Sequence, residues 1–438
     1  MTKYQQEYRS KVTTVEDAVK RVRSGDHVYP MHSNQASVPL LDALYARKDE
    51  LTDVSILAST ACDNYKLFSL DAEGIFHYST LFMSGPDRAA MKAGRSVNNI
   101  CYQLSRLREV LTEDYRPDVL FLMTTPMDEN GYFNFGIAAN EMDVVLDSAR
   151  EVIVQVNRFV PYVESPEQKV HISQVDAIVE LDQPLTTVAT VPPSDIDRKI
   201  AGHIIERIPD GATVQIGIGG IANAIGYSLD GHKHLGAHTE LFTDSLMYLM
   251  KKGVIDNSRK EIDTGRTCFG FAFGSQEMYD FLDHNDRVIS RPHYYTNNPA
   301  VVSRISNFVS VNGCMSVDIS GQVCSESIGP VQYSGTGGQL DFVRGASLSP
   351  GGQSFLAMHS VAEKKDGTRI SKICLFHEPG TIITVPRSDV MYVVTEYGVA
   401  DLKNKGRYER ARALISIAHP DFRDELEYQA RKAGYLGD

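Results

Sequence analysis

The sequence has no long apolar run. The most hydrophobic stretches, such as Val119 to Met123, are far too short to cross a bilayer, and the first residues contain no apolar core of signal-peptide length. We therefore expect a cytoplasmic protein with no membrane partner. Low-complexity tracts are also missing, and an apolar fraction of 42% with a charged fraction of 23% is typical of a folded globular chain.

Metal-binding patterns and an excess of positive charge are missing as well. The six cysteines form no CxxC pair, and the histidines form no HExxH motif, so we expect no metal site and mostly buried, reduced thiols. The net charge is −12, and the lysines and arginines are scattered among acids. A nucleic-acid partner would need a basic face, so this class of partner is excluded.

The length and the order of segments indicate two α/β domains. A chain of 438 residues is too long for one core of ordinary size. Short β-type runs alternate with helical segments, which predicts an α/β fold with a largely parallel sheet. The sequence loosens into a proline-containing linker between Gln183 and Asp195, so we place two domains at residues 1–190 and 191–438.

A repeated pattern relates the two halves of the chain. Residues 207–214 resemble residues 21–28, and residues 308–321 resemble residues 119–131, with 186 and 190 residues between the matching glycines. Two nearly equal separations predict a duplication, and hence two similar open-sheet α/β domains. The second half follows its first strand with a glycine turn, whereas the first half has His32-Ser33-Asn34-Gln35. We therefore expect the second half to carry the site and the first half to frame it.

The stretch from Val214 to Asp244 contains this glycine turn and an acid. A β-type run meets Gly217, Gly219 and Gly220, and a helix-like segment follows. Main-chain N–H groups at such a helix N-terminus can approach an anionic ligand such as phosphate or pyrophosphate. A second short strand, residues 235–239, should place Glu240 at its carboxyl end, the edge where open α/β sheets bind ligands.

Three interpretations fit this stretch. Gly217-x-Gly219-x-x-Ala222 satisfies the dinucleotide fingerprint, which would put Glu240 on a ribose hydroxyl of NAD in an oxidoreductase. Alternatively, Glu240 is a nucleophile beside bound coenzyme A, and the glycine turn lies against the coenzyme. In the third interpretation the glycines form an ordinary turn and the glutamate is solvated.

Two further segments and one further acid stand out in the second half. Residues 334–342 place three glycines before an apolar segment, which suits a close approach to a ligand but also a hairpin turn. Asn312-Gly313 interrupts a strand that begins at Phe308 and is typical of a turn. Glu396 follows a strand at residues 391–394 and offers a second carboxylate.

Together these segments resemble the acetyl-CoA hydrolase/transferase family of CoA-transferases, and within it the enzymes that act on 4-hydroxybutyryl-CoA or butyryl-CoA with acetate. The resemblance covers nearly the whole chain. The segments that carry it are Met127-Asp128-x-x-Gly131-Tyr132-Phe133, Gln215-Ile216-Gly217-Ile218-Gly219, His238-Thr239-Glu240, Gly337-Gly338-Gln339-Leu340-Asp341-Phe342, Thr395-Glu396-Tyr397-Gly398 and Ala418-His419-Pro420-Asp421-Phe422.

The resemblance implies roles for individual residues. Glu240 would be the catalytic glutamate that becomes a glutamyl-CoA thioester, the main-chain N–H of Gly338 an oxyanion donor, and Asn312 the neighbouring catalytic amide. Glu396 would be structural. The residues implied in coenzyme binding are Gln215, Ile216, Gly217, Ile218, Gly219, Met315, Gly338 and Lys365.

The implied function is transfer of coenzyme A between a short-chain acyl-CoA and a carboxylate such as acetate, with ping-pong kinetics. Coenzyme A is then a substrate, no prosthetic group is needed, and a homo-oligomer is expected. An acyl-CoA hydrolase would use the same residues and is the nearest alternative; an NAD-dependent oxidoreductase and a non-catalytic CoA-binding module are more distant. The repeat makes Met31, His32, Asn34 and Gln35 candidates for the acyl pocket.

Overall fold

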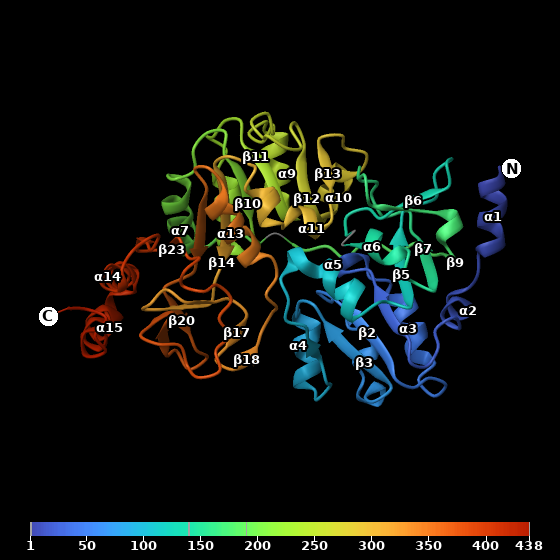
Figure 1. The fold of residues 1–438 in the computed structure, drawn as a ribbon, viewed down its shortest axis with the longest axis horizontal. Coiled ribbons are helices and arrows are strands. Elements are labelled where there is room, and N and C mark those ends of the chain that lie inside the picture. Colours follow the sequence, from blue (N-terminus) through green and yellow to red (C-terminus); the bar gives the residue numbers. More distant parts are fainter. Residues whose placement is uncertain (1, 139–140, 190, 438) are drawn as a thin grey trace. The chain divides into compact units, whose positions relative to one another are not determined.

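The computed structural model describes residues 2–138, 141–189 and 191–437 (Figure 1). The chain divides into two compact units, one formed by residues 1–188 and 268–296 and the other by residues 189–267 and 297–438. The division into domains at residue 190 stays a proposal. Among the described residues, no helix has the length and apolar character needed to cross a membrane.

The first half of the chain forms a seven-stranded sheet in which every neighbouring pair is parallel. Its inner strand β5 is buried along its whole length, as expected when both faces of a parallel sheet are covered. In spatial order the strands are β4 (Asn98–Asn99), β3 (Phe76–Thr80), β2 (Val54–Ala58), β1 (His27–Pro30), β5 (Val119–Thr124), β7 (Glu151–Val156) and β9 (Ala177–Glu180).

A second sheet has eight strands, and its last pair, β23 and β24, is antiparallel. The pairs of β10 with β11, β10 with β14, β14 with β19, and β19 with β23 are parallel. In spatial order the strands are β13 (Val288–Ser290), β12 (Thr267–Ala272), β11 (Gly236–Phe242), β10 (Thr213–Ile216), β14 (Phe308–Gly313), β19 (Gln353–Ala357), β23 (Tyr392–Thr395) and β24 (Gly398–Asp401).

The two sheets repeat one strand order, as the duplication predicts. In the first sheet β1 lies between β2 and β5, and in the second β10 lies between β11 and β14. The register agrees as well, because Val28 pairs with Val119 and Val214 pairs with Val309. The α/β class with two similar, largely parallel sheets is therefore confirmed.

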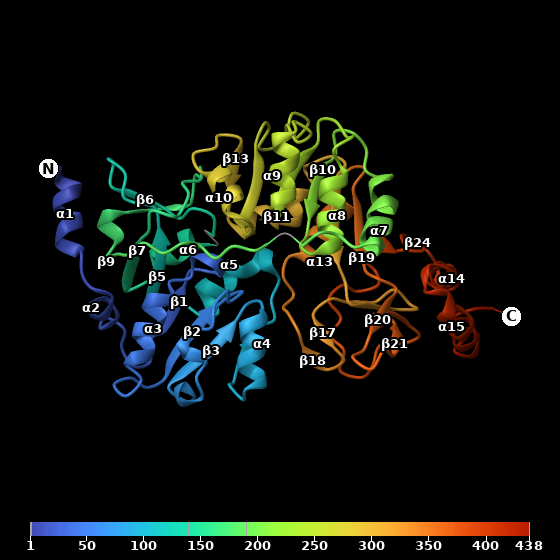
Figure 2. The same cartoon turned by 180° about the vertical axis from the view of Figure 1, so that it is seen from behind.

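Helices flank these sheets, and α7, α8 and α9 line up side by side along the second one (Figure 2). The last two helices, α14 and α15, are drawn in red in Figure 1. The helices are α1 (Lys3–Lys11), α2 (Val15–Val19), α3 (Val38–Ala46), α4 (Gly85–Lys92), α5 (Leu107–Glu109), α6 (Met142–Leu146), α7 (Asp195–Ile205), α8 (Gly220–Ser228), α9 (Asp244–Lys251), α10 (Gln276–Leu282), α11 (His293–Thr296), α12 (Pro299–Val302), α13 (Gln339–Leu348), α14 (Arg407–Ile417) and α15 (Pro420–Lys432).

Candidate active site

Three neighbouring parallel strands end at one edge of the second sheet, and each carries a predicted site residue near that end. Gln215 is the last but one residue of β10, Glu240 lies two residues before the end of β11, and Asn312 is the last but one of β14. The predicted end of the Glu240 strand, residue 239, was three residues too early, because β11 ends at Phe242. The predicted interruption at Asn312-Gly313 was wrong, because both residues belong to β14.

The carboxylate of Glu240 is held by an amide that the sequence did not single out. Asn297 Nδ2 donates a hydrogen bond of 2.8 Å to Glu240 Oε2, and the Asn297 side chain is fully buried. Asn297 directly follows α11 and lies 57 residues from Glu240 along the chain. No local pattern marks it, since an Asn-Asn-Pro sequence is typical of a turn.

Gly338 packs directly against this pair. A methyl group on its Cα would overlap both Asn297 Nδ2 and Glu240 Oε2, so the present contact between these two side chains requires glycine here. Gly338 is also the N-cap residue of α13, whose first N–H groups have no partner within the helix. The positive end of the helix dipole therefore lies beside the carboxylate.

Asn312 and Gln215 form a separate group of side chains on β10 and β14. The two amides bond to each other twice, at 3.1 and 3.2 Å, and Asn312 Nδ2 also donates to Ser310 Oγ at 2.9 Å. Ser310 Oγ in turn donates to Gln215 Oε1 at 2.8 Å. The role of Asn312 as a catalytic amide stays a proposal, whereas the amide of Asn297 contacts Glu240 directly.

The glycine turn follows β10 as predicted. Gly217 N donates to the carbonyl of Val311, 3.0 Å away, and Gly219 has a φ of +102°, which favours glycine. A Cβ on Gly220 would lie 2.5 Å from Asp197 Oδ2, so the start of α8 is packed tightly on α7. Ile218 is 67% exposed and Gly219, which has no side chain, is exposed too, so the main chain of the turn is accessible to a ligand.

The two groups are linked through the start of α13. Gln339 Nε2 donates to the carbonyl of Gly313 at 2.7 Å, which ties the residue after Gly338 to the end of β14. Two further predicted residues form no hydrogen bond to either group within the described part of the chain. Met315 N donates to the carbonyl of Cys324, and Lys365 is exposed at the turn of a hairpin. Their contact with the coenzyme stays a proposal.

Cys314 lies two residues beyond Asn312 and is the cysteine nearest to Asn312 along the chain. Burial raises the pKa of the Cys314 thiol to about 12, so the side chain stays protonated near neutral pH. A protonated thiol is a poor nucleophile. Glu240 therefore has no competitor in this thiol.

The repeat shows that the first half has no acidic residue at the position that corresponds to Glu240. Thr213 pairs with Gly236, and the equivalent His27 pairs with Ser55. Counting four residues onward along each strand places Ser59 at the position that corresponds to Glu240. This difference supports the prediction that the second half carries the chemistry.

Glu396 has a structural environment, as the resemblance implies. Its carboxylate accepts hydrogen bonds from Ser360 N at 2.9 Å and from Ser360 Oγ at 2.6 Å. Both bonds join the residue after β23 to the segment after β19. The Glu396 carboxylate thus connects the segments that follow two neighbouring strands, β19 and β23.

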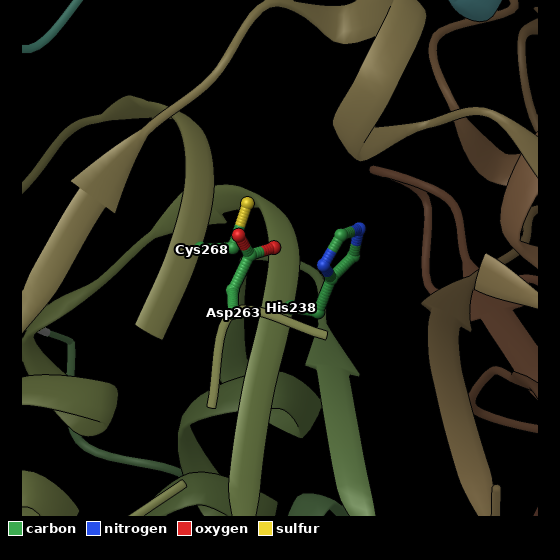
Figure 3. A group of neighbouring side chains, drawn as sticks. All are labelled: His238, Asp263 and Cys268. Carbon is green, nitrogen blue, oxygen red and sulfur yellow. The ribbon is translucent and has the colours of Figure 1, made fainter. Parts of the chain in front are cut away.

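Figure 3 shows His238 on β11, Asp263 in the loop before β12, and Cys268 on β12. His238 and Asp263 belong to the second unit, whereas Cys268 begins the segment that belongs to the first. Within either unit taken alone, the described residues offer no group of three side chains able to hold a metal ion. The ring of His238 is fully buried and packs edge-on against Phe308.

Comparison with known families identifies the class of this protein. The model of the acetyl-CoA hydrolase/transferase N-terminal domain matches residues 1–192, and that of the C-terminal domain matches residues 274–430. The chain therefore belongs to the acetyl-CoA hydrolase/transferase family, and it is an enzyme of the CoA-transferase class.

Individual relatives agree with this class. A probable butyrate:acetyl-CoA coenzyme A-transferase of Syntrophomonas wolfei is 40% identical over 436 residues, which cover 98% of this chain and 96% of the relative. RipA from Yersinia pestis has a similar structure, with a TM-score of 0.93 at 34% identity over 99% of this chain and all of RipA. A 4-hydroxybutyrate CoA-transferase from Porphyromonas gingivalis gives a TM-score of 0.80 at 32% identity over 98% of this chain and all of its own.

Proposed function

We propose that this enzyme moves coenzyme A from a short-chain acyl-CoA, such as butyryl-CoA or 4-hydroxybutyryl-CoA, to a carboxylate such as acetate. The observation that carries the proposal is the position of Glu240, in contact with the Asn297 amide and Gly338 near the carboxyl end of its strand. The names of relatives such as the S. wolfei transferase support the choice of short acyl chains.

Glu240 reacts in two linked displacements, as the nucleophile in the first and as the acyl group under attack in the second. One carboxylate oxygen attacks the thioester carbonyl carbon, so that a C–O bond forms, the C–S bond breaks, and coenzyme A leaves as a thiolate. The thiolate then attacks Glu240 Cδ of the mixed anhydride, which releases the product acid and leaves a glutamyl-CoA thioester. An incoming carboxylate reverses the two steps, and this order gives ping-pong kinetics.

Each attack moves negative charge onto a carbonyl oxygen. The Asn297 amide donates to the Glu240 carboxylate, and Gly338 at the start of α13 packs against both side chains. In this proposal the main-chain N–H of Gly338 is the second donor, which a glycine offers without side-chain crowding. A well-placed donor of this kind lowers the barrier by about 3 kcal/mol. These groups therefore supply the stabilisation that a weakly nucleophilic carboxylate needs.

The glycine turn binds the coenzyme in this proposal. Residues Gln215 to Gly219 run along it, and the N-terminus of α8 provides N–H groups for an anionic group of the coenzyme. Binding energy from this remote part of the substrate positions the thioester for attack by Glu240. Met315 and Lys365 are proposed as further contacts.

Dependence of the reaction on the acceptor tests this function. With butyryl-CoA and acetate varied together, we expect acetyl-CoA as the product and parallel lines in double-reciprocal plots, because the enzyme form that reacts with acetate has already released butyrate. Release of free coenzyme A at a rate independent of acetate would instead identify an acyl-CoA hydrolase.

Replacing Asn297 by alanine should lower the rate of transfer about 10²-fold to 10³-fold, because one donor to the reacting carboxylate is lost. The measurement is kcat with butyryl-CoA and acetate, with folding checked by circular dichroism. Asn298→Ala is the neighbouring control, since Asn298 Oδ1 accepts a hydrogen bond from Ala300 N at the start of α12. Equal activity of both variants would contradict the role of Asn297.

A further inference from the structure

Gly338 is the last residue of a loop, residues 334–338, which we call the glycine loop. Gly337 within it has a φ of +55°, and Gly338 begins α13 in contact with Glu240 and Asn297. A small shift of the loop would move the Gly338 N–H relative to the reacting carboxyl group. Such a shift costs rate steeply, because donors act only at short range.

A buried acid lies under this loop. Glu326 is 4% exposed and precedes the hairpin formed by β17 (Ser327–Ile328) and β18 (Val331–Gln332), which leads into the glycine loop. Its main-chain carbonyl accepts hydrogen bonds from Tyr333 N at 2.8 Å and from Ser334 N at 3.2 Å. The main chain of Glu326 thus closes the base of the hairpin.

The Glu326 carboxylate reaches further into the loop. Its Oε2 accepts from Thr336 Oγ1 at 3.4 Å and from Gln332 Nε2 at 3.3 Å, and its Oε1 accepts from Thr384 Oγ1 at 2.9 Å. These three donors are uncharged. A buried carboxylate surrounded by neutral donors is costly to desolvate, so packing alone does not explain an acid at this place.

Ser325, the residue before Glu326, binds the residue that follows Gly338. Ser325 Oγ donates to Gln339 Oε1 at 2.6 Å, while Gln339 Nε2 binds the carbonyl of Gly313. Adjacent residues 325 and 326 therefore hold Gln339 and Thr336, the residues one after and two before Gly338. Hydrogen bonds to one short segment thus hold the chain on both sides of Gly338.

We infer that Glu326 is a positioning residue for the transfer reaction, which holds the glycine loop through Thr336 so that the Gly338 N–H stays aimed at the carboxyl group of Glu240. The inference rests on the proposed function. An acid accepts from Thr336, Gln332 and Thr384 at once, whereas a glutamine has one oxygen and would turn an N–H donor toward at least one of these donors. Glu326→Gln therefore loosens the loop with little change in volume.

The test compares Glu326→Gln, Thr336→Val and the double variant in single-turnover formation of the glutamyl-CoA adduct from butyryl-CoA. We expect each single variant to react about 10-fold to 100-fold more slowly than wild type, with KM for butyryl-CoA within about twofold. Because both residues act through one contact, the double variant should be no slower than the slower single variant. Glu378→Gln is the control, since this exposed acid lies beside Gly329 of the same hairpin.

Thermal unfolding separates positioning from general support of the fold. Wild-type rates in Glu326→Gln and Thr336→Val would overturn the inference, as would rate losses that add in the double variant. A lower melting temperature with an unchanged rate would also overturn it. If Glu326→Gln does not fold, Thr336→Val alone decides, since it keeps the acid and the volume of the side chain. Absence of any adduct on the wild-type protein would count against the proposed function instead.

Discussion

Glu240→Gln is expected to lower kcat for transfer from butyryl-CoA to acetate by at least about 10³-fold, because the neutral amide keeps the shape of the side chain but cannot attack a thioester. The Asn297 contact and the packing on Gly338 leave room for a side chain of this size. The free energy of unfolding should therefore change little. Acetyl-CoA formation in a steady-state assay, with urea unfolding of the same preparations, measures both effects.

Glu427→Gln is the control for this loss. Glu427 lies on α15, where its half-exposed carboxylate pairs with Arg431, and such a surface pair contributes about 0.5 kcal/mol to stability. Its activity should equal that of the wild type. Activity of Glu240→Gln within tenfold of this control would mean that another group is the nucleophile.

Gly338→Ala is expected to lower the rate of transfer by about 10²-fold or more, because the new methyl group displaces Glu240 and Asn297 from their present contact. Both are side-chain ends that can turn away, so the protein should still fold. The expected pattern is a low kcat with KM for acyl-CoA nearly unchanged. Single-turnover adduct formation measures this loss directly.

A helix glycine elsewhere in the second unit provides the matched control. Gly202 lies inside α7, and a Cβ there would meet no atom within 4 Å. Gly202→Ala should keep full activity and stabilise the protein by about 0.5 to 1 kcal/mol through helix propensity. Equal activity of Gly338→Ala and Gly202→Ala would show that the methyl group at residue 338 is tolerated and that the close packing is not needed for the reaction.

Local patterns in the sequence predicted the features whose physical causes are themselves local. Buried β-type runs gave the parallel strands, and the positive φ of Gly219 explains why a glycine occurs in the turn after β10. The register of the two sheets confirmed the duplication. The prediction that Asn312-Gly313 interrupts its strand was wrong. Parallel pairing of Asn312 with Leu356 and of Gly313 with Ala357 overrides the turn preference of these residues.

The contacts that complete the site are not local, which is why the sequence did not reveal them. Asn297 reaches Glu240 from 57 positions away, and Glu326 meets Thr384 across 58 positions. An asparagine before Asn-Pro and a glutamate before a short hairpin are ordinary residues in their local context. Only the folded sheet edge brings them to the glutamate and to the glycine loop.

The mass of the intact protein after incubation with butyryl-CoA, without an acceptor, tests the covalent role of Glu240 most directly. We predict an adduct with the mass of coenzyme A on the wild-type protein, its removal by acetate, and no adduct on Glu240→Ala. An adduct that also forms on Glu240→Ala would contradict the assignment of the nucleophile. Steady release of coenzyme A by a wild-type protein that never carries the adduct would contradict the covalent transfer mechanism itself.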